Sequence, residues 1–198
     1  MIGVIDSKIC NIYSLTNMLK KIGADYIICE SPAELNKVNK IVMPGVGAFP
    51  KAIENLTKSG LKDGILKLAE KGMPLLGICL GMQLLFDESD EFGKTQGLKL
   101  IPGIIRKIKT NRILPHMGWN DITINHDIPL LNGIKQGVDV YFVHSFMAET
   151  DERYIAAYTI YDEKIPAIVY KDNIFGAQFH PEKSMHSGEQ IMRSFANL

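Results

Sequence analysis

Cys79 stands between two glycines in the segment Gly77–Gly81 (GICLG), directly after an apolar run over residues 73–76. This order is typical of a buried strand, a sharp turn and the start of a helix. The glycines two residues before and after the cysteine have the spacing of a nucleophile elbow that carries Cys in place of Ser. The N-terminus of a following helix favours thiolate over thiol. The segment therefore predicts that Cys79 is a nucleophile.

A second segment, Phe179–Glu182 (FHPE), supplies the groups that such a nucleophile needs. His180 can take the proton of Cys79, and Glu182 can orient the imidazole and stabilise its charged form. The two segments lie far apart in the sequence, so only the fold can bring them together. We predict a Cys-His-Glu triad of Cys79, His180 and Glu182.

Composition restricts the possible functions. The 198 residues suffice for a substantial core, and we predict one domain spanning residues 1–198. Lys and Arg together number 22, as do Asp and Glu, and this balance gives no sign of a nucleic acid or anionic membrane partner. No apolar run approaches the roughly 18–20 residues that span a bilayer, and the first residues do not have the pattern of a signal peptide. With only three cysteines, we expect a cytoplasmic protein without disulfides.

The N-terminal part alternates short apolar runs with amphipathic stretches. Strands are expected at residues 2–5, 26–29, 40–43 and 74–78, and helices at 11–22, 48–56 and 61–71. Gly23 follows the first helix and would end it. Such alternation indicates βαβ units and a parallel sheet with both faces covered.

The pattern changes after residue 99. Short runs rich in Ile, Val and Tyr are separated by turn residues and predict strands at residues 104–108, 122–124, 138–143, 154–160 and 166–169. A last helix is expected at 187–196. The predicted fold class is therefore α/β, with a mainly parallel sheet flanked by helices and an added antiparallel portion. The acidic stretch 87–91 is interpreted as a solvated loop.

Candidate groups follow several of the predicted strands. In open α/β sheets, sites form beyond the carboxyl ends of the strands. The segment Met43–Gly47, the nucleophile Cys79 and the segment Val143–Ser145 all occupy such positions. We expect them to meet at one edge of the sheet.

Five segments together resemble one family. They are residues 44–49 (PGVGAF), 77–86 (GICLGMQLLF), 115–120 (PHMGWN), 141–145 (YFVHS) and 178–184 (QFHPEKS). The chain resembles the class I (triad) glutamine amidotransferases and, more narrowly, the glutaminase subunits of imidazole glycerol phosphate synthases. The resemblance implies a flavodoxin-like fold that hydrolyses L-glutamine to L-glutamate and ammonia with no metal or organic cofactor. It also implies a heterodimer with a (β/α)8 barrel, the cyclase subunit, which uses the ammonia in histidine biosynthesis.

The resemblance assigns roles to individual residues. Cys79 attacks the glutamine side chain and forms a thioester, His180 shuttles protons, and Glu182 holds His180. Backbone groups form the oxyanion hole at Val46, Gly47 and Leu80. Substrate binding is implied for Gly45, Gln83, His144, Ser145 and Phe146. A place at the interface with the cyclase is implied for Asn11, Trp119, Tyr141 and Lys183.

One turn departs from the family pattern. The family has Asp-Tyr-Gly-x-Gly-Asn after the first strand, whereas residues 6–11 of this chain are DSKICN. Because this turn lies near the synthase face in the family, a second partner stays open: a paralogous glutaminase that supplies ammonia to a sugar-amidine synthase in surface-glycan biosynthesis. A free-standing γ-glutamyl hydrolase and a non-catalytic regulatory subunit are two further alternatives. The intact triad residues argue against the last.

The other cysteines and histidines have simpler interpretations. Cys29 is expected to pack within a strand, and Cys10 is expected to lie in a loop without a reactive role. The remaining histidines, at positions 116, 126, 144 and 186, match no usual zinc spacing. We predict no metal site.

Overall fold

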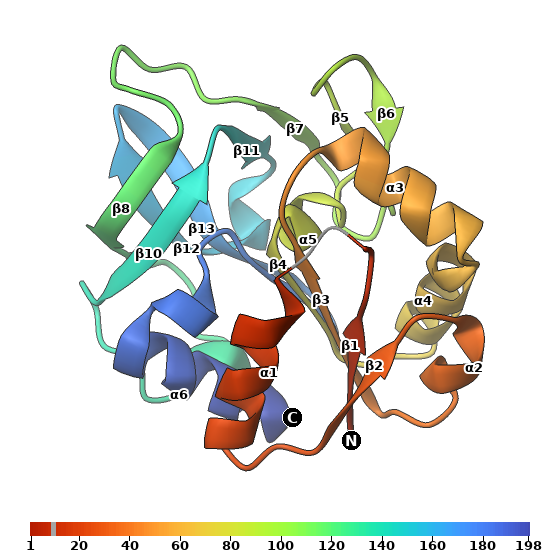
Figure 1. The fold of residues 1–198 in the computed structure, drawn as a ribbon. Coiled ribbons are helices and arrows are strands. Elements are labelled where there is room, and N and C mark those ends of the chain that lie inside the picture. Colours follow the sequence, from red (N-terminus) through yellow and green to blue (C-terminus); the bar gives the residue numbers. More distant parts are fainter. Residues whose placement is uncertain (9–10) are drawn as a thin grey trace.

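A computed structural model describes residues 1–8 and 11–198 (Figure 1). Its centre is an eight-stranded sheet. The strands follow the spatial order β2 (Tyr26–Cys29), β1 (Ile2–Ile5), β3 (Lys40–Gly45), β4 (Leu75–Cys79), β14 (Ile174–Ala177), β13 (Glu163–Lys171), β12 (Ile155–Tyr161) and β9 (Thr123–Ile124). The first five run parallel and the last three are joined antiparallel. The predicted fold class is confirmed.

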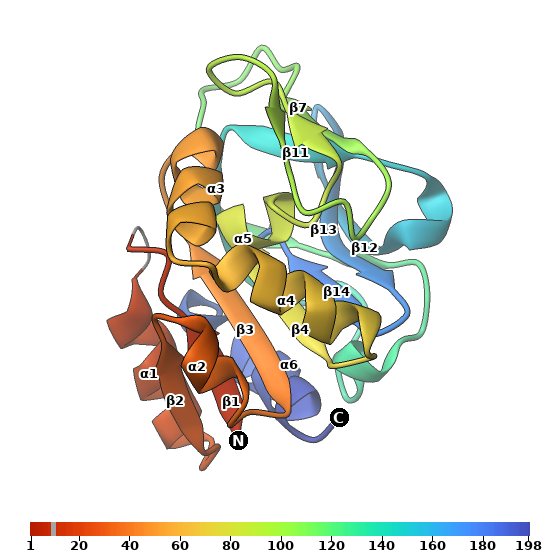
Figure 2. The same ribbon diagram turned by 90° about the vertical axis from the view of Figure 1, so that its right-hand side faces the viewer.

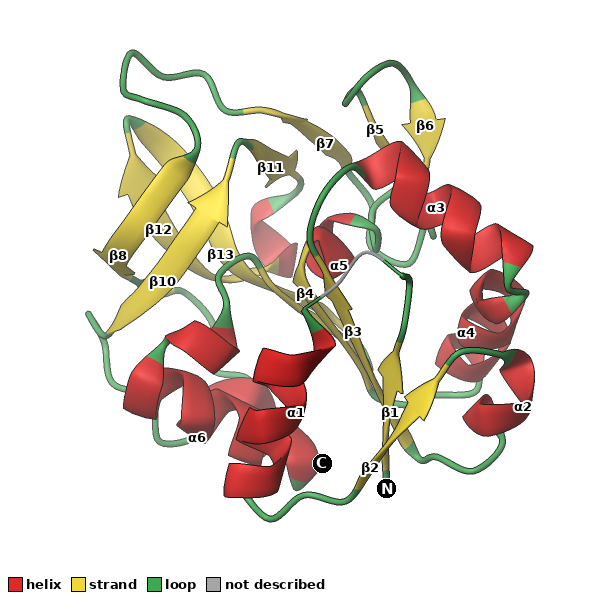
Figure 3. Ribbon diagram, viewed as in Figure 1, coloured by secondary structure: helices red, strands yellow, loops and turns green. Residues whose placement is uncertain are grey.

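Helices cover both faces of this sheet, as Figure 3 shows. One face carries α1 (Ile12–Lys21) and α6 (Met185–Ala196). The other carries α2 (Pro32–Leu35), α3 (Phe49–Lys58) and α4 (Leu61–Glu70). Each of the longer helices has an apolar stripe, which it buries against the sheet. Two hydrophobic clusters result, one containing Leu19 of α1 and Phe195 of α6, the other containing Leu56 of α3.

Two smaller sheets extend the fold near the carboxyl ends of the parallel strands. One pairs β8 (His116–Asp121) with β10 (Asp139–His144), and the other has the order β11 (Phe146–Glu149), β7 (Ile104–Lys107), β5 (Glu88–Ser89), β6 (Thr95–Gln96). Phe142 of β10 packs in the cluster of α1 and α6, and Ile105 of β7 packs in the cluster of α3. The two added sheets therefore lie on opposite faces of the large one (Figures 1 and 2).

The predicted helices and strands are confirmed with small shifts of their ends. Asn11 caps α1 by accepting a hydrogen bond from the Ser14 backbone N–H, and Gly23 follows the helix with a φ of 72°. The prediction missed α2, β5, β6, β8, β11 and the central strand β14. The strand β8 contains Gly, Asn and Asp, which are poor strand formers, and it is a strand because of its pairing with β10.

The interpretation of residues 87–91 as a solvated loop is wrong. Ser89 is buried within β5. The Asp87 carboxylate accepts a hydrogen bond from the Gly103 N–H at 2.8 Å, and the Glu91 carboxylate accepts one from the Phe49 N–H at 2.7 Å. Phe49 begins α3, where backbone N–H groups lack partners within the helix. The acidic side chains therefore satisfy backbone donors.

The first turn keeps an unusual backbone conformation. Lys8 has a φ of 63°, a left-handed conformation at a position where the family pattern has glycine. Its N–H donates to the Asp6 carboxylate at 2.7 Å, and its ammonium pairs with Asp6 and Glu30. These bonds raise the pKa of Lys8 and favour the turn. The prediction for Cys10 falls outside the described residues.

Within the described ranges, no helix is long and apolar enough to cross a membrane.

Candidate active site

Cys79 ends β4 directly beside the end of β3, where Gly45 is its register partner. Its backbone has a φ of 54° and a ψ of −112°, a conformation that is strained for a residue with a side chain. A single helical turn, α5 (Leu80–Gln83), follows at once. The strained turn is thus a strand-to-helix elbow with the cysteine at its tip, as its glycine frame predicts.

Close backbone packing explains the two glycines of this frame. A Cβ atom on Gly81 would lie 1.7 Å from the Met43 carbonyl oxygen, and one on Gly77 would lie 2.5 Å from the Gly81 carbonyl oxygen. Real Cβ atoms cannot approach so closely, so α5 rests on the backbones of β3 and β4 only because both residues are glycines. The nucleophile elbow is therefore fixed by direct backbone contact.

His180 lies where β14 leads into the 3-10 turn η3 (Pro181–Lys183). Its Nδ1 atom is 2.7 Å from the Glu182 Oε1 atom, and the two side chains are only 4% and 6% exposed. The His180 Nε2 atom makes no hydrogen bond with any described residue. Burial alone would lower the pKa of His180, but its interactions with Cys79 and Glu182 outweigh burial and raise the pKa to about 10. An imidazolium is thus favoured beside the cysteine.

The cysteine sulfur has polar neighbours on the side of the added sheets. The Cys79 thiol points at the Val143 carbonyl oxygen, 3.9 Å away, and the Gln178 amide nitrogen lies 4.0 Å from the sulfur. The Gln83 amide donates to the Gln178 side-chain oxygen and to the Phe146 carbonyl oxygen, each at 3.0 Å. A buried polar network therefore connects the nucleophile to the segment between β10 and β11.

Cys79 and His180 open into a cavity of about 350 Å³. It is lined by Val46, Gly47, Cys79, Leu80, Gln83, Glu91, Pro115, Val143, His144, Ser145, Phe146 and His180. The structure thus brings together the predicted nucleophile, the base and seven of the residues named for the oxyanion hole or substrate. Glu182 lies behind His180, and Gly45 lies beside the cavity, packed against Gly81.

Two lining residues were not predicted: Glu91 and Pro115. Glu91 belongs to the acidic stretch that was taken for a loop, and Pro115 begins the PHMGWN segment. Val143, at the end of the predicted strand 138–143, lines the cavity with Cys79 as expected. Only the carboxylate of Glu91 offers a distinctive chemical signal, since a negative charge beside a cavity suits a cationic group.

Two buried histidines support the rim of the cavity. The His144 Nδ1 atom is 2.8 Å from the Phe146 carbonyl oxygen, and its Nε2 atom is 3.1 Å from the His116 Nδ1 atom. Because a carbonyl can only accept, His144 donates from Nδ1 and accepts from His116 at Nε2. Burial lowers the pKa of His144 to about 3 and also lowers that of His116. His144 is thus a neutral support, and the His116 Nε2 atom lies 2.8 Å from the Asn120 Oδ1 atom. The part of the chain that is described holds no group of three metal-ligating side chains.

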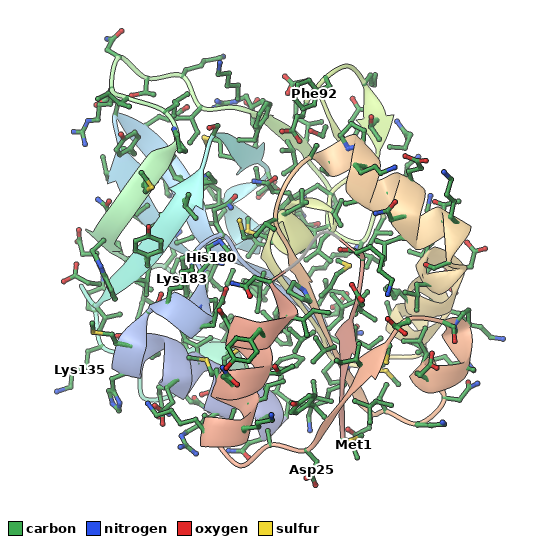
Figure 4. All side chains as sticks on the ribbon, viewed as in Figure 1. Met1, Asp25, Phe92, Lys135, His180 and Lys183 are labelled. Carbon is green, nitrogen blue, oxygen red and sulfur yellow. The ribbon has the colours of Figure 1, made fainter. Side chains whose placement is uncertain are left out.

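Three of the predicted interface residues, Trp119, Tyr141 and Lys183, lie beside the base. Trp119 is 45% exposed, and its ring centroid lies 5.9 Å from that of Tyr141. The Lys183 ammonium lies 5.5 Å from the Tyr141 ring centroid. Figure 4 shows Lys183 close to His180 near the middle of the view, with Met1 and Asp25 at its lower edge. Asn11, at the start of α1, is exposed.

The chain is similar in sequence to known proteins. The family described as "Glutamine amidotransferase class-I" matches residues 3–197. Imidazole glycerol phosphate synthase subunit HisH of Bacillus cereus is 45% identical over 198 residues, covering 100% of this chain and 95% of that protein. The subunit of the same name from Caldanaerobacter subterraneus subsp. tengcongensis is 46% identical over 199 residues, covering 100% and 98%.

Solved structures share the fold at low sequence identity. A structure titled as a glutamine amidotransferase superposes with a TM-score of 0.79 at 18% identity, covering 100% of this chain and 99% of the other. PurLQS from Thermotoga maritima gives a TM-score of 0.79 at 20% identity, covering 99% and 97%.

Proposed function

The chain belongs to the class I glutamine amidotransferase family, and we propose that it is the glutaminase subunit of an imidazole glycerol phosphate synthase. It hydrolyses L-glutamine to L-glutamate and ammonia, and the ammonia serves histidine biosynthesis. One observation carries this proposal: a single cavity joins Cys79 to His180, whose imidazole is bonded to the Glu182 carboxylate. The full-length identity of 45–46% to synthase subunits supports the pathway.

The first half of the reaction forms a thioester. The Cys79 sulfur attacks the side-chain carboxamide carbon of glutamine and forms a tetrahedral oxyanion, and the C–N bond breaks as this oxyanion collapses to the thioester. The imidazolium of His180 gives its proton to the departing nitrogen, so ammonia leaves as a neutral molecule. Glu182 keeps the imidazole oriented and stabilises its charged form during the transfer.

The second half releases glutamate. A water molecule attacks the thioester carbon, now with neutral His180 accepting its proton, and the sulfur leaves as the thiolate. Each step passes through a negatively charged oxygen, for which we assign the backbone N–H of Leu80 and a second donor at Val46 or Gly47. All three residues line the cavity.

The far end of the cavity suits the amino-acid part of the substrate. Glutamine carries an α-ammonium and an α-carboxylate there. We assign the Glu91 carboxylate to the ammonium by charge, and Gln83 with the backbone of His144–Phe146 to the remaining polar groups. Gly45 stays a predicted contributor through its position beside the elbow.

The partner would dock beside the base. We assign the aromatic surface of the exposed Trp119 and the partly buried Tyr141, with Lys183 and Asn11, to a cyclase subunit that forms a heterodimer with this chain and has a (β/α)8 barrel. Trp119 and the exposed Met185 line one shallow hollow, so apolar surface continues from β8 to the start of α6. We expect this biosynthetic enzyme, a single domain over residues 1–198, to act in the cytoplasm.

The decisive experiment measures ammonia release from glutamine by the purified protein, alone and with the histidine-pathway cyclase and its nucleotide ligand. We expect low activity alone and strong stimulation by the cyclase. Full turnover by the isolated chain would favour a free-standing hydrolase. Labelling of Cys79 by a glutamine-analogue electrophile without stimulation would move the partner to a sugar-amidine synthase.

A further inference from the structure

The free edge of β10 faces the catalytic groups. In the described part of the chain, β10 pairs with one strand only, β8, with Tyr141 opposite Trp119. Along an antiparallel strand, backbone groups point alternately to its two edges. The backbone groups of Tyr141 and the carbonyl of Val143 bond to residues outside β8, so they belong to the free edge.

The turn that carries His180 completes this edge. The His180 N–H donates to the Tyr141 carbonyl oxygen at 2.9 Å. In return, the Tyr141 N–H donates to the Ser184 Oγ atom at 3.0 Å, and the Ser184 hydroxyl donates to the His180 carbonyl oxygen at 2.7 Å. One hydroxyl thus closes a ring of three hydrogen bonds between the strand and the backbone of His180.

Ser184 is well placed for this role. It is 1% exposed and lies between η3 and α6. Two residues along the same edge, the Val143 carbonyl oxygen faces the Cys79 sulfur at 3.9 Å. The edge of β10 therefore contacts both the nucleophile and the backbone of the base, and Ser184 supplies the one side chain in the connection to the base.

We propose that Ser184 is a positioning residue that sets His180 against Cys79 by binding the backbone of His180 to the free edge of β10. It touches neither substrate nor the reacting atoms. This inference rests on the proposed function, because it gives His180 the role of the base. Loss of the hydroxyl would free the Tyr141 N–H and let His180 shift relative to the sulfur.

The test compares two serines near or within α6. Ser184→Ala removes the bridging hydroxyl. Ser194→Ala is the matched control, because Ser194 is also buried and its hydroxyl makes a single 3.3 Å bond to the Asn132 carbonyl oxygen.

For Ser184→Ala in the cyclase complex, we expect kcat to fall roughly 10- to 100-fold, with KM changed less than about threefold. Small misplacements of catalytic groups act on the chemical step, which is why kcat should change more than KM. Ser194→Ala should keep kcat, and Ser184→Thr, which retains the hydroxyl, should recover part of it.

Two further measurements test the inference without glutamine turnover or without a folded variant. Alkylation of Cys79 by iodoacetamide at neutral pH needs no glutamine, and it should slow in Ser184→Ala but not in Ser194→Ala. Should Ser184→Ala not fold, amide hydrogen exchange of the unaltered protein decides: the Tyr141 N–H should exchange as slowly as the His180 N–H. Equal kcat and alkylation rates in the two alanine variants, or rapid exchange at Tyr141, would overturn the inference. Absence of glutaminase activity in the unaltered complex would instead contradict the proposed function.

Discussion

The nucleophile and the base are held in different ways. Cys79 lies between the central strands, and its elbow is fixed by backbone contacts that leave no room for even a methyl group on Gly77 or Gly81. The turn of His180 also packs closely on α6, where a Cβ atom on Gly188 would lie 1.9 Å from the Pro181 carbonyl oxygen. Its connection to β10, however, consists of hydrogen bonds.

This difference makes the elbow of Cys79 rigid and lets the position of His180 relative to β10 adjust. Close-packed backbone has no nearby alternative arrangement, whereas hydrogen bonds to an edge strand can lengthen or realign. The strand β10 also carries Tyr141, whose partly buried ring contacts the exposed Trp119. A partner that docks on this surface therefore has a short route through β10 to the hydrogen bonds that hold the base.

The largest effect should come from filling the nucleophile elbow. In Gly81→Ala, the new methyl group would overlap the Met43 carbonyl, and we expect a loss of about 3 kcal/mol or more in the free energy of unfolding, with little soluble protein. Gly72→Ala is the control, because Gly72 has a φ of 84° and nothing within 4 Å of the new atom, which leaves only backbone strain of about 1 kcal/mol. Thermal and denaturant unfolding measure the loss of stability in both variants. Equal losses would show that the elbow tolerates expansion.

Replacing the sulfur should abolish activity without affecting the fold. Cys79→Ala is expected to lower glutamine-dependent turnover by about 10⁴-fold or more, while the complex still uses free ammonium. Cys29→Ala is the matched control: Cys29 is fully buried, burial raises its pKa to about 11, and its thiol should be inert. When the unaltered protein is treated with a glutamine-analogue electrophile, mass spectrometry should find the label on Cys79 alone. Substantial turnover by Cys79→Ala would rule out its role as nucleophile.

Substitutions of His180 and Glu182 should lower kcat to different extents. Glu182→Ala is expected to be roughly 10- to 100-fold less damaging to kcat than His180→Ala, because the carboxylate orients the imidazole and does not carry the proton. Steady-state kinetics of both variants in the cyclase complex test this order. Equal or reversed effects would contradict the two roles.

The charge of His180 also predicts a pH dependence. Its interactions with Cys79 and Glu182 raise its pKa from 6.5 to about 10 against the opposing effect of burial. A raised pKa stabilises the folded state fully below about pH 6.5, and the stabilisation disappears as the pH rises towards 10. Glu182→Gln should lower the His180 pKa, measured by NMR titration of the imidazole, and flatten the decline of the unfolding free energy across that range. An unchanged His180 pKa would mean that Glu182 does not stabilise the charge.

The sequence predicted what local patterns encode. Glycine spacing around Cys79 sufficed for the elbow, and strand-helix alternation sufficed for the central sheet except β14. The FHPE segment supplied the candidate partners of Cys79. Contacts between distant backbone groups leave no such pattern. Ser184 is one serine among many until the fold brings Tyr141 to it, and Glu91 is one acidic residue in a charged stretch until α3 presents the Phe49 N–H. Pairing with β10 likewise decides that a segment with Gly, Asn and Asp is a strand.

The smallest effect should come from the exposed surface beside the base. Trp119→Ala removes a half-exposed ring that contacts Tyr141 edge-on but leaves the backbone bonds between Tyr141, Ser184 and His180 in place. We therefore expect basal glutaminase activity to stay within about twofold, since surface substitutions away from buried networks change little. Affinity for the cyclase should weaken about 10-fold or more, because large aromatic side chains often dominate interfaces. Titration of the cyclase against ammonia release measures both quantities.

Phe92→Ala is the control. Phe92 is an 86% exposed aromatic residue that Figure 4 places at the upper edge of the molecule, away from His180. If Trp119→Ala lowered basal turnover as strongly as Ser184→Ala, the ring itself would help to hold the base, and the contrast between a packed nucleophile and a hydrogen-bonded base would have to include the surface aromatic residues.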